Sequence, residues 1–118
     1  MASIGHIELF CNDTARTRDQ LVAAFDCDVT TEQPGGFVWL RLGHVEILLR
    51  PAQGPTPRFA SYQESGMAIV IYSADFVATH NKALRAGMAI GLHDGDAKCP
   101  TFQDSDGHWF QVVEHEND

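Results

Sequence analysis

The sequence predicts an α+β fold made of two βαβββ modules. The first observation is an internal repeat, because residues 4–25 return in degraded form near Met67, with His6 matching Ala68 and Asp13 matching Asp75. In each copy an apolar run of strand length leads through an acidic residue into a pattern of helical period. Three further strand-like runs then follow in each copy. We expect a curved, mixed and mostly antiparallel sheet around a cup, with both helices on its convex side.

The chain length favours one domain. Its 118 residues, 44% of them hydrophobic and 20% charged, are ordinary for one globular domain with a buried core. The one stretch with linker-like composition carries three prolines between Pro51 and Pro57. We therefore divide the domain 1–118 into module one (1–52), a linker (53–65) and module two (66–118).

Module one begins with a strand over Ile4–Cys11. This strand alternates small or apolar residues, suited to packing under a helix, with a second set that includes His6 and Glu8. A helix is expected to start at Asp13 or Thr14, whose side-chain oxygens can accept from its first amides, and to reach Phe25. Three more strands are expected, over Val29–Glu32, Phe37–Leu42 and His44–Arg50.

Module two repeats this order from a strand over Met67–Ser73. Asp75 is expected to cap a helix that turns Val77, Ala83 and Leu84 inward, and Gly87 stands where a left-handed C-terminal cap is expected. The remaining strands are expected over Ala89–Leu92, Cys99–Gln103 and Trp109–Glu114, with residues 104–107 forming the turn before the last strand.

Charge and composition exclude several classes of partner. Eight Lys and Arg residues against 16 Asp and Glu residues give a net charge of −8, and the basic residues are scattered, which argues against nucleic acid. The apolar runs are too short to cross a bilayer, and the N-terminus lacks the pattern of a signal peptide. Three cysteines without C-x-x-C spacing favour a reduced, cytoplasmic setting.

Two polar side chains stand out on the predicted strands. If the modules are related by pseudo-symmetry, His6 pairs with Ala68, and Glu46 pairs with Gln111 in the strand that closes the second module. One imidazole and one carboxylate aimed into a concavity form half of a metal site. The alternative for His6 is a core histidine bonded to Glu46, and Gln111 is also consistent with a hydrogen-bonding cavity residue.

Aromatic residues offer a second functional feature. They are suited to form a wall for a flat ligand, although core packing or a dimer seam explains any one of them equally well. These residues are Phe37, Trp39, Tyr72, Phe102 and Trp109.

Four segments in this order resemble one known family. They are G-H-I-E-L-F-C-N-D in the first strand, L-G-H-V-E-I-L-L-R-P in the fourth, A-L-R-A-G at the end of the second helix, and T-F-Q-D-S-D-G-H-W-F-Q-V-V-E near the C-terminus. Together they are similar to the vicinal oxygen chelate superfamily, which holds glyoxalase I, extradiol dioxygenases, fosfomycin-resistance enzymes and bleomycin-resistance proteins. This resemblance implies a homodimer.

The resemblance also implies where a metal would bind. Family members take one ligand each from the first, fourth, fifth and eighth strands, which places His6, Glu46, Ala68 and Gln111 at those positions. Ala68 has no donor atom, and Gln111 replaces a usual glutamate. His44, Tyr72 or His108 are the candidates to compensate.

This departure from the family pattern favours a binding protein without a catalytic metal, similar to the bleomycin-resistance branch. The expected guest is a cationic or aromatic small molecule, held around His6, Glu46, Phe37, Trp39, Tyr72, Phe102, Trp109 and Gln111. The alternative is a glyoxalase-type lyase or dioxygenase that holds one divalent Zn, Ni, Fe or Mn ion through His6, Glu46 and Gln111. In such an enzyme Glu46 or a bound water would shuttle a proton. A third reading is a regulatory module that kept the fold and lost the ligand.

Overall fold

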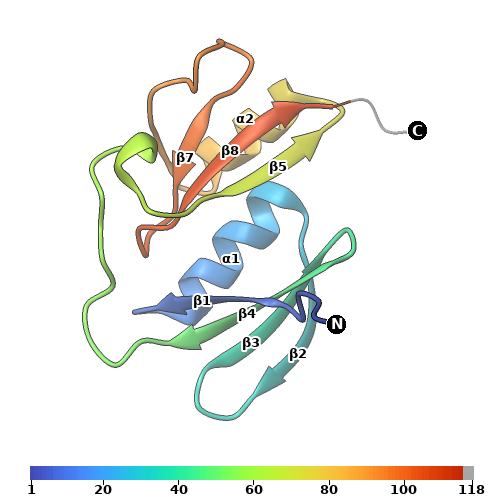
Figure 1. The fold of residues 1–118 in the computed structure, drawn as a ribbon, viewed down its shortest axis with the longest axis vertical. Helices are drawn as coiled ribbons and strands as arrows, with labels where there is room; N and C mark the ends of the chain where they lie inside the picture. The colour runs from blue at the N-terminus through green and yellow to red at the C-terminus, as the bar shows by residue number, and fades with distance from the viewer. Residues whose placement is uncertain (116–118) are drawn as a thin grey trace.

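The computed structural model describes residues 1–115 and confirms the predicted fold class. Eight strands form two four-stranded sheets, and each sheet carries one α-helix (Figure 1). The order of elements is βαβββ in each half of the chain, as two βαβββ modules require. The last three residues of predicted module two lie outside the described residues.

The first sheet has the strand order β1-β4-β3-β2. β1 runs parallel to β4, whereas β4–β3 and β3–β2 are antiparallel. Its strands are β1 (Ile7–Cys11), β2 (Asp28–Gln33), β3 (Phe37–Leu42) and β4 (Val45–Pro51). β1 is three residues shorter than predicted, because hydrogen-bonded pairing with β4 begins only at Ile7 and Ile47.

The second sheet repeats this topology in the order β5-β8-β7-β6. β5 is parallel to β8, and the other two pairs are antiparallel, so both sheets are mixed and mostly antiparallel as predicted. Its strands are β5 (Ile69–Ser73), β6 (Ala89–Ile90), β7 (Thr101–Gln103) and β8 (Trp109–Glu114). A 3₁₀ turn, η1 (Tyr62–Glu64), lies in the connection between the two sheets.

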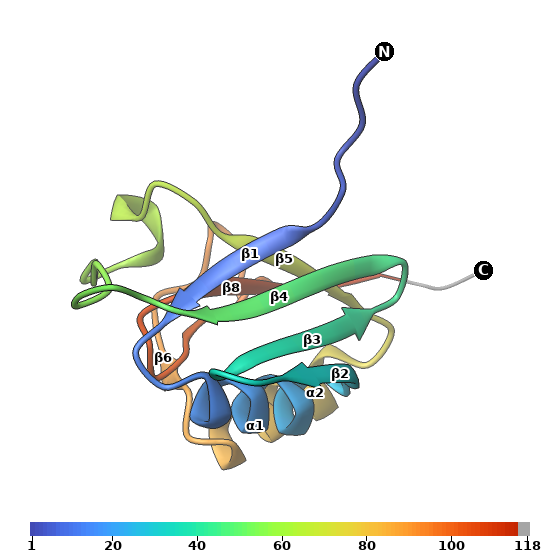
Figure 2. The same cartoon turned by 90° about the horizontal axis from the view of Figure 1, so that it is seen from below.

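The two helices, α1 (Thr14–Phe25) and α2 (Phe76–Arg85), lie side by side on one side of the strands (Figure 2). Asp13 and Asp75 cap them as predicted, each accepting from the amide three residues on. Gln20 on α1 donates to the carbonyl of Ala86 at the end of α2. The helices therefore tie the halves of the chain together.

The hydrophobic core lies between the sheets and the helices. On β1, Leu9 and Cys11 are buried against α1, whereas Glu8 and Phe10 point to the opposite, open face. Phe25 of α1 packs on Phe110 of β8 with ring centroids 5.3 Å apart, so one core spans both halves. None of the helices in residues 1–115 has the length and apolar character needed to cross a membrane.

Candidate functional site

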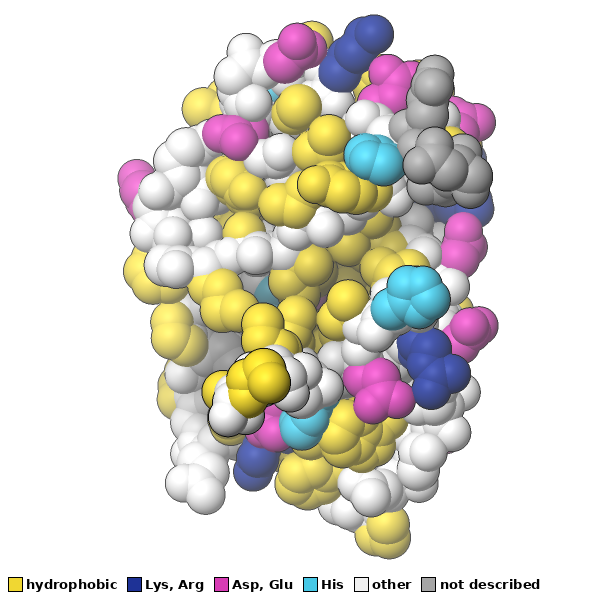
Figure 3. Space-filling model, turned by 45° about the vertical axis from the view of Figure 1, so that its right-hand side comes forward, with side chains coloured by type: hydrophobic (Ala, Val, Ile, Leu, Met, Phe, Trp, Pro, Cys, Tyr) yellow, Lys and Arg dark blue, Asp and Glu magenta, His cyan; other side chains and the backbone are white. Residues whose placement is uncertain are grey.

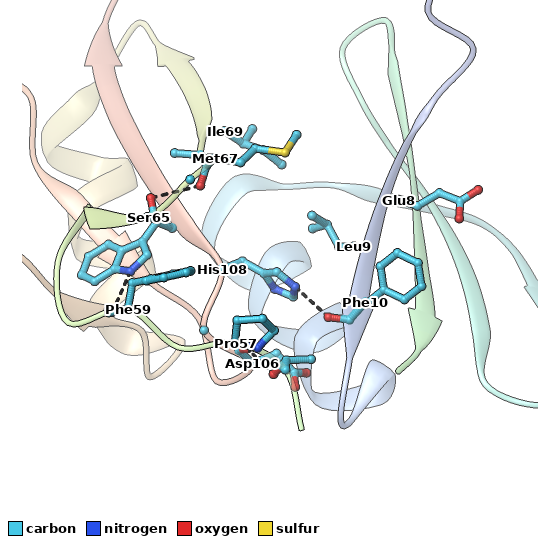
Figure 4. A pocket seen from close by; sticks show the side chains of 15 residues that line it. Glu8, Leu9, Phe10, Pro57, Phe59, Ser65, Met67, Ile69, Asp106 and His108 are labelled. Atoms are coloured by element: carbon cyan, nitrogen blue, oxygen red, sulfur yellow. Dashed lines mark hydrogen bonds between the residues drawn. The ribbon is translucent and has the colours of Figure 1, made fainter. Parts of the chain in front are cut away.

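An apolar cavity of about 320 Å³ lies between the two halves of the chain (Figure 4). Its walls are residues 8–10 of β1, residues 65–69 leading into β5, and residues 106–109 of the β7–β8 turn. The connection between the sheets borders it with Thr56, Pro57 and Phe59. This volume is at the lower end of the range typical of small-molecule pockets.

The cavity exists because β1 and β5 are edge strands that do not pair with each other. Each is hydrogen-bonded on one side only, β1 to β4 and β5 to β8. The cavity separates their free edges and is lined mainly by apolar side chains such as Phe59, Met67 and Trp109. The indole N–H of Trp109 donates to the carbonyl of Phe59 at 3.1 Å, which fixes the connecting segment over β8.

Asp106 holds the β7–β8 turn against the start of α1. Its side-chain oxygens accept from the amides of Asn12 and Asp13 and from the hydroxyl of Thr17, and the residue is only 2% exposed. A buried carboxylate needs such donors to offset its desolvation. Asp106 therefore fixes the position of the β7–β8 turn, which forms the floor of the cavity, relative to the first half of the chain.

His108 makes a second contact across the cavity wall. Its Nε2 lies 2.9 Å from the carbonyl oxygen of Phe10 on β1 (Figure 4). Its Nδ1 lies 2.7 Å from Oδ2 of Asp104. The Asp104 carboxylate also accepts from the amides of Asp106 and His108, which closes the turn. Asp106 and His108 thus connect the β7–β8 turn to the first half of the chain at two points beside the cavity, one at the start of α1 and one on β1.

His6 and Glu46 share the open face of the first sheet, as predicted from strand alternation. His6 directly precedes Ile7, whose partner Ile47 directly follows Glu46. Their side chains are engaged separately, however. The His6 Nε2 lies 2.7 Å from Oε2 of Glu8, and Glu46 accepts from Arg41 at 3.1 Å. The alternative of a His6–Glu46 bond is therefore wrong.

Aromatic side chains surround a small ionic network on this open face. The edge of the His6 ring contacts Trp39, with centroids 4.8 Å apart. The guanidinium of Arg50 lies over the rings of Phe10 and Phe37, at 5.0 and 5.4 Å from their centroids. The hydrogen bond with His6 is the main cause that lowers the pKa of the Glu8 carboxyl, and the hydrogen bond from Arg50 adds to it. Phe37 and Trp39 thus belong to this face and not to the cavity wall.

Gln111 lies on the corresponding face of the second sheet and is 7% exposed. Its amide nitrogen donates to Oδ2 of Asp94 at 2.6 Å and to the hydroxyl of Tyr62 at 3.1 Å. Because both partners come from connecting segments, this amide anchors those segments over the sheet. Its carbonyl oxygen stays available as an acceptor.

The remaining predicted aromatic residues are dispersed. Trp109 lines the cavity, whereas Phe102 has no exposed surface and packs in the core. Tyr72 is 63% exposed, stacks on His115 and lines a groove of about 740 Å³ at the other end of the β5 edge. Figure 3 shows apolar side chains gathered in a hollow on the face it views.

The four positions that the family pattern assigns to metal ligands are divided between the two halves of the chain. His6 and Glu46 belong to the first sheet and Gln111 to the second, and each is bonded to protein partners. Within residues 1–115, no three His, Cys, Asp or Glu side chains gather closely enough to hold a metal ion.

Sequence reasoning missed most of the cavity-lining residues. Phe59 lies in the predicted linker and Met67 at the start of a predicted strand, and single hydrophobic residues there carry no signal. His108 is one of the candidates for a compensating metal ligand, and its ring contacts Asp104 and the Phe10 carbonyl. One feature of the sequence that marks part of this region is the turn D-S-D-G-H, with two carboxylates and an imidazole in five residues.

Several solved structures share this fold. The fosfomycin resistance protein FosX from Mesorhizobium loti superposes with a TM-score of 0.76 at 15% identity, covering 98% of this chain and 94% of that one. Lactoylglutathione lyase from Agrobacterium tumefaciens gives 0.69 at 15% identity, with 97% and 94% covered. TioX from Micromonospora sp. ML1 gives 0.68 at 20% identity, with 96% and 100% covered.

At these identities the likeness shows the fold alone. No curated protein sequence matches this chain. A family model, described as Glyoxalase/Bleomycin resistance protein/Dioxygenase superfamily, matches residues 3–112, which is nearly the whole chain. The chain therefore belongs to the glyoxalase/bleomycin resistance protein/dioxygenase superfamily.

Proposed function

We propose that this protein binds an apolar, aromatic small molecule in the cavity between its two halves and holds it without chemical change. The observation that carries the proposal is the cavity itself, which is lined by Phe59, Met67 and Trp109 and by two strand edges. Burying an aromatic guest there removes apolar surface from water on both sides. The fosfomycin resistance proteins of this fold are also named for a small molecule.

The charged residues of the lining do not dictate the charge of the ligand. The Asp106 carboxylate is bonded at the start of α1. The Glu8 side chain points away from the cavity (Figure 4) and is bonded to His6 and Arg50 on the open face. The preference for a cationic guest therefore rests on the net charge of −8, which raises the local concentration of cations around the whole molecule. The aromatic character of the proposed ligand is therefore better supported than its charge.

Removing one cavity wall tests the proposal. N-phenyl-1-naphthylamine is an uncharged aromatic probe whose binding is followed by its own fluorescence and by quenching of Trp109. We expect Phe59→Ala to weaken binding about ten-fold, which corresponds to about 1.4 kcal/mol of lost apolar contact. Val77→Ala, on the exposed face of α2, is the matched control and should bind as the wild type does. Equal affinities for all three proteins would refute the proposal.

The proposal of an incomplete metal site is tested separately. Purified protein exposed to Zn, Ni, Fe or Mn and then dialysed should retain less than a stoichiometric amount of metal. One tightly held ion per chain that is lost in both His6→Ala and Glu46→Ala would instead support a metal-dependent lyase or dioxygenase.

We also propose that the protein is a homodimer. The edge of β5 and the segment before it expose Met67, Val70 and Tyr72, with exposed fractions between 47% and 68%. Clustered apolar side chains at a free strand edge are typical of a surface that another chain covers.

A further inference from the structure

His108 is the one imidazole among the described residues that joins the two sheets at the cavity wall. Its Nδ1 lies 2.7 Å from Oδ2 of Asp104 on its own turn, and its Nε2 lies 2.9 Å from the backbone carbonyl oxygen of Phe10 on β1. The His108 side chain is 17% exposed and the Asp104 side chain is fully buried. Water therefore has little access to the ring, and the two protein partners determine its protonation.

Both partners of the ring are acceptors. A backbone carbonyl oxygen never donates, and a carboxylate that already accepts two backbone amides is likewise an acceptor. A neutral imidazole has one N–H and can satisfy only one of them, whereas an imidazolium donates to both. The geometry at His108 therefore fits the charged form of the ring.

The surrounding charges act in the same direction. Burial lowers the pKa of His108, but the hydrogen bond and charge of Asp104, the Phe10 carbonyl and the charge of Asp106 together raise this pKa above its ordinary 6.5. From the other elements, Arg58 donates to the carbonyl of Ser105 in the turn, and Glu8 of β1 belongs to the cavity lining but turns its carboxylate away from the cavity. Arg58 is the one cation in this group of charged neighbours, so acidic groups predominate.

We propose that His108 is a protonation-dependent positioning residue, whose imidazolium holds β1 against the β7–β8 turn and sets the width of the cavity. When the ring loses its proton, either the Phe10 carbonyl loses its donor or an Nδ1 lone pair faces the Asp104 carboxylate. Each outcome weakens the contact between the halves beside the cavity. The contact itself does not require a ligand, and only its effect on binding rests on the proposed function.

The direction of the pH effect follows from the raised pKa. Below about pH 6.5 the ring is charged in both the folded and the unfolded chain, so its contribution to stability is fully present. As the pH rises through the higher pKa of the folded state, the folded ring loses its proton and this contribution is lost. Ligand affinity should fall over the same pH interval.

Two readouts on the full chain test this inference. NMR titration of the His108 ring should give a midpoint above 6.5, and the amide of Cys11, in the peptide that accepts from Nε2, should shift with the same midpoint. Asp104→Asn should lower the His108 midpoint. In the wild type, affinity for N-phenyl-1-naphthylamine should fall with that midpoint, whereas in His108→Gln it should not vary with pH.

The outcomes separate the inference from the proposed function. A His108 midpoint at or below 6.5 overturns the inference without reference to any variant. A raised midpoint with pH-independent probe binding also overturns it, because the ring then does not set the cavity. A raised midpoint that the Cys11 amide follows, with no probe binding at any pH, supports the contact and refutes the proposed function.

Discussion

At the scale of single residues, Asp106 makes the most extensive side-chain contact between the two halves of the chain. Its carboxylate is buried and receives three donors from the start of α1, although it lies 89 residues from Thr17 in the chain. A hydrogen bond to a buried charged group stabilises the folded protein more than a bond between neutral groups does. Leaving a buried donor or acceptor without its partner costs more free energy than the bond contributes. Asp106 thus links the two halves at the cavity floor.

Asp106→Asn should destabilise the protein by about 3 kcal/mol in urea unfolding, because its amide group would face backbone N–H donors. Asp28→Asn is the control, since Asp28 is exposed on β2, and it should change stability by less than about 0.5 kcal/mol. If the two substitutions have the same effect, Asp106 does not join the halves.

At the same scale, the face on which a residue lies was predictable from the sequence, whereas its side-chain partner was not. Strand alternation placed His6 and Glu46 correctly on one open face, because side-chain direction in a strand has a period of two. It did not predict that Glu8 and Arg41 would bind them. Side-chain pairing depends on neighbours across the sheet, which a linear pattern does not reveal.

At the scale of elements, the ends of the helices were predictable because they depend on local chemistry. Asp13 and Asp75 cap α1 and α2, and Gly87 ends α2 with a φ of +89°. The prediction that Val77, Ala83 and Leu84 face inward on α2 was partly wrong. Ala83 is buried, but Val77 and Leu84 are 55% and 42% exposed, so the face that α2 turns to α1 and to its own sheet includes Ala83 and leaves the other two outside.

Gly87→Ala tests the helix end. A Cβ there would meet only Gln20 at an ordinary 3.6 Å, so its cost comes from the left-handed backbone, about 1–2 kcal/mol. Gly54→Ala is the matched control, because Gly54 has open space around it and its backbone lies outside the left-handed region. This substitution should leave the free energy of unfolding unchanged or raise it by up to about 1 kcal/mol. Thermal unfolding measures both, and equal effects would contradict the cap.

At the scale of the whole molecule, the repeat predicted the fold class but not the space between the repeats. Each module follows from local patterns, whereas the arrangement of β1 and β5 depends on how α1 and α2 pack on each other. The cavity is lined from four separate segments, so no local pattern could identify it. Trp109, one of eight predicted site residues, lines it.

The proposed homodimer is also a property of the whole molecule. Val70→Asp places a charge on the exposed edge of β5 and should shift the protein from dimer to monomer in analytical ultracentrifugation. Ile90→Asp is matched, because Ile90 is similarly exposed (51% against 47%) but lies on β6, and it should remain dimeric. A monomeric wild type would contradict the proposal directly.

The central claim is that the space between the two halves is a ligand site. Backbone NMR during titration with N-phenyl-1-naphthylamine tests this claim most directly, because it locates the ligand without any substitution. We predict saturable shifts that are largest at residues 65–69 and 106–109, which line the cavity away from the open face, and that extend to residues 8–10. Saturable shifts centred instead on the open face of the first sheet around His6 and Trp39, or no saturable shift at all, would contradict it.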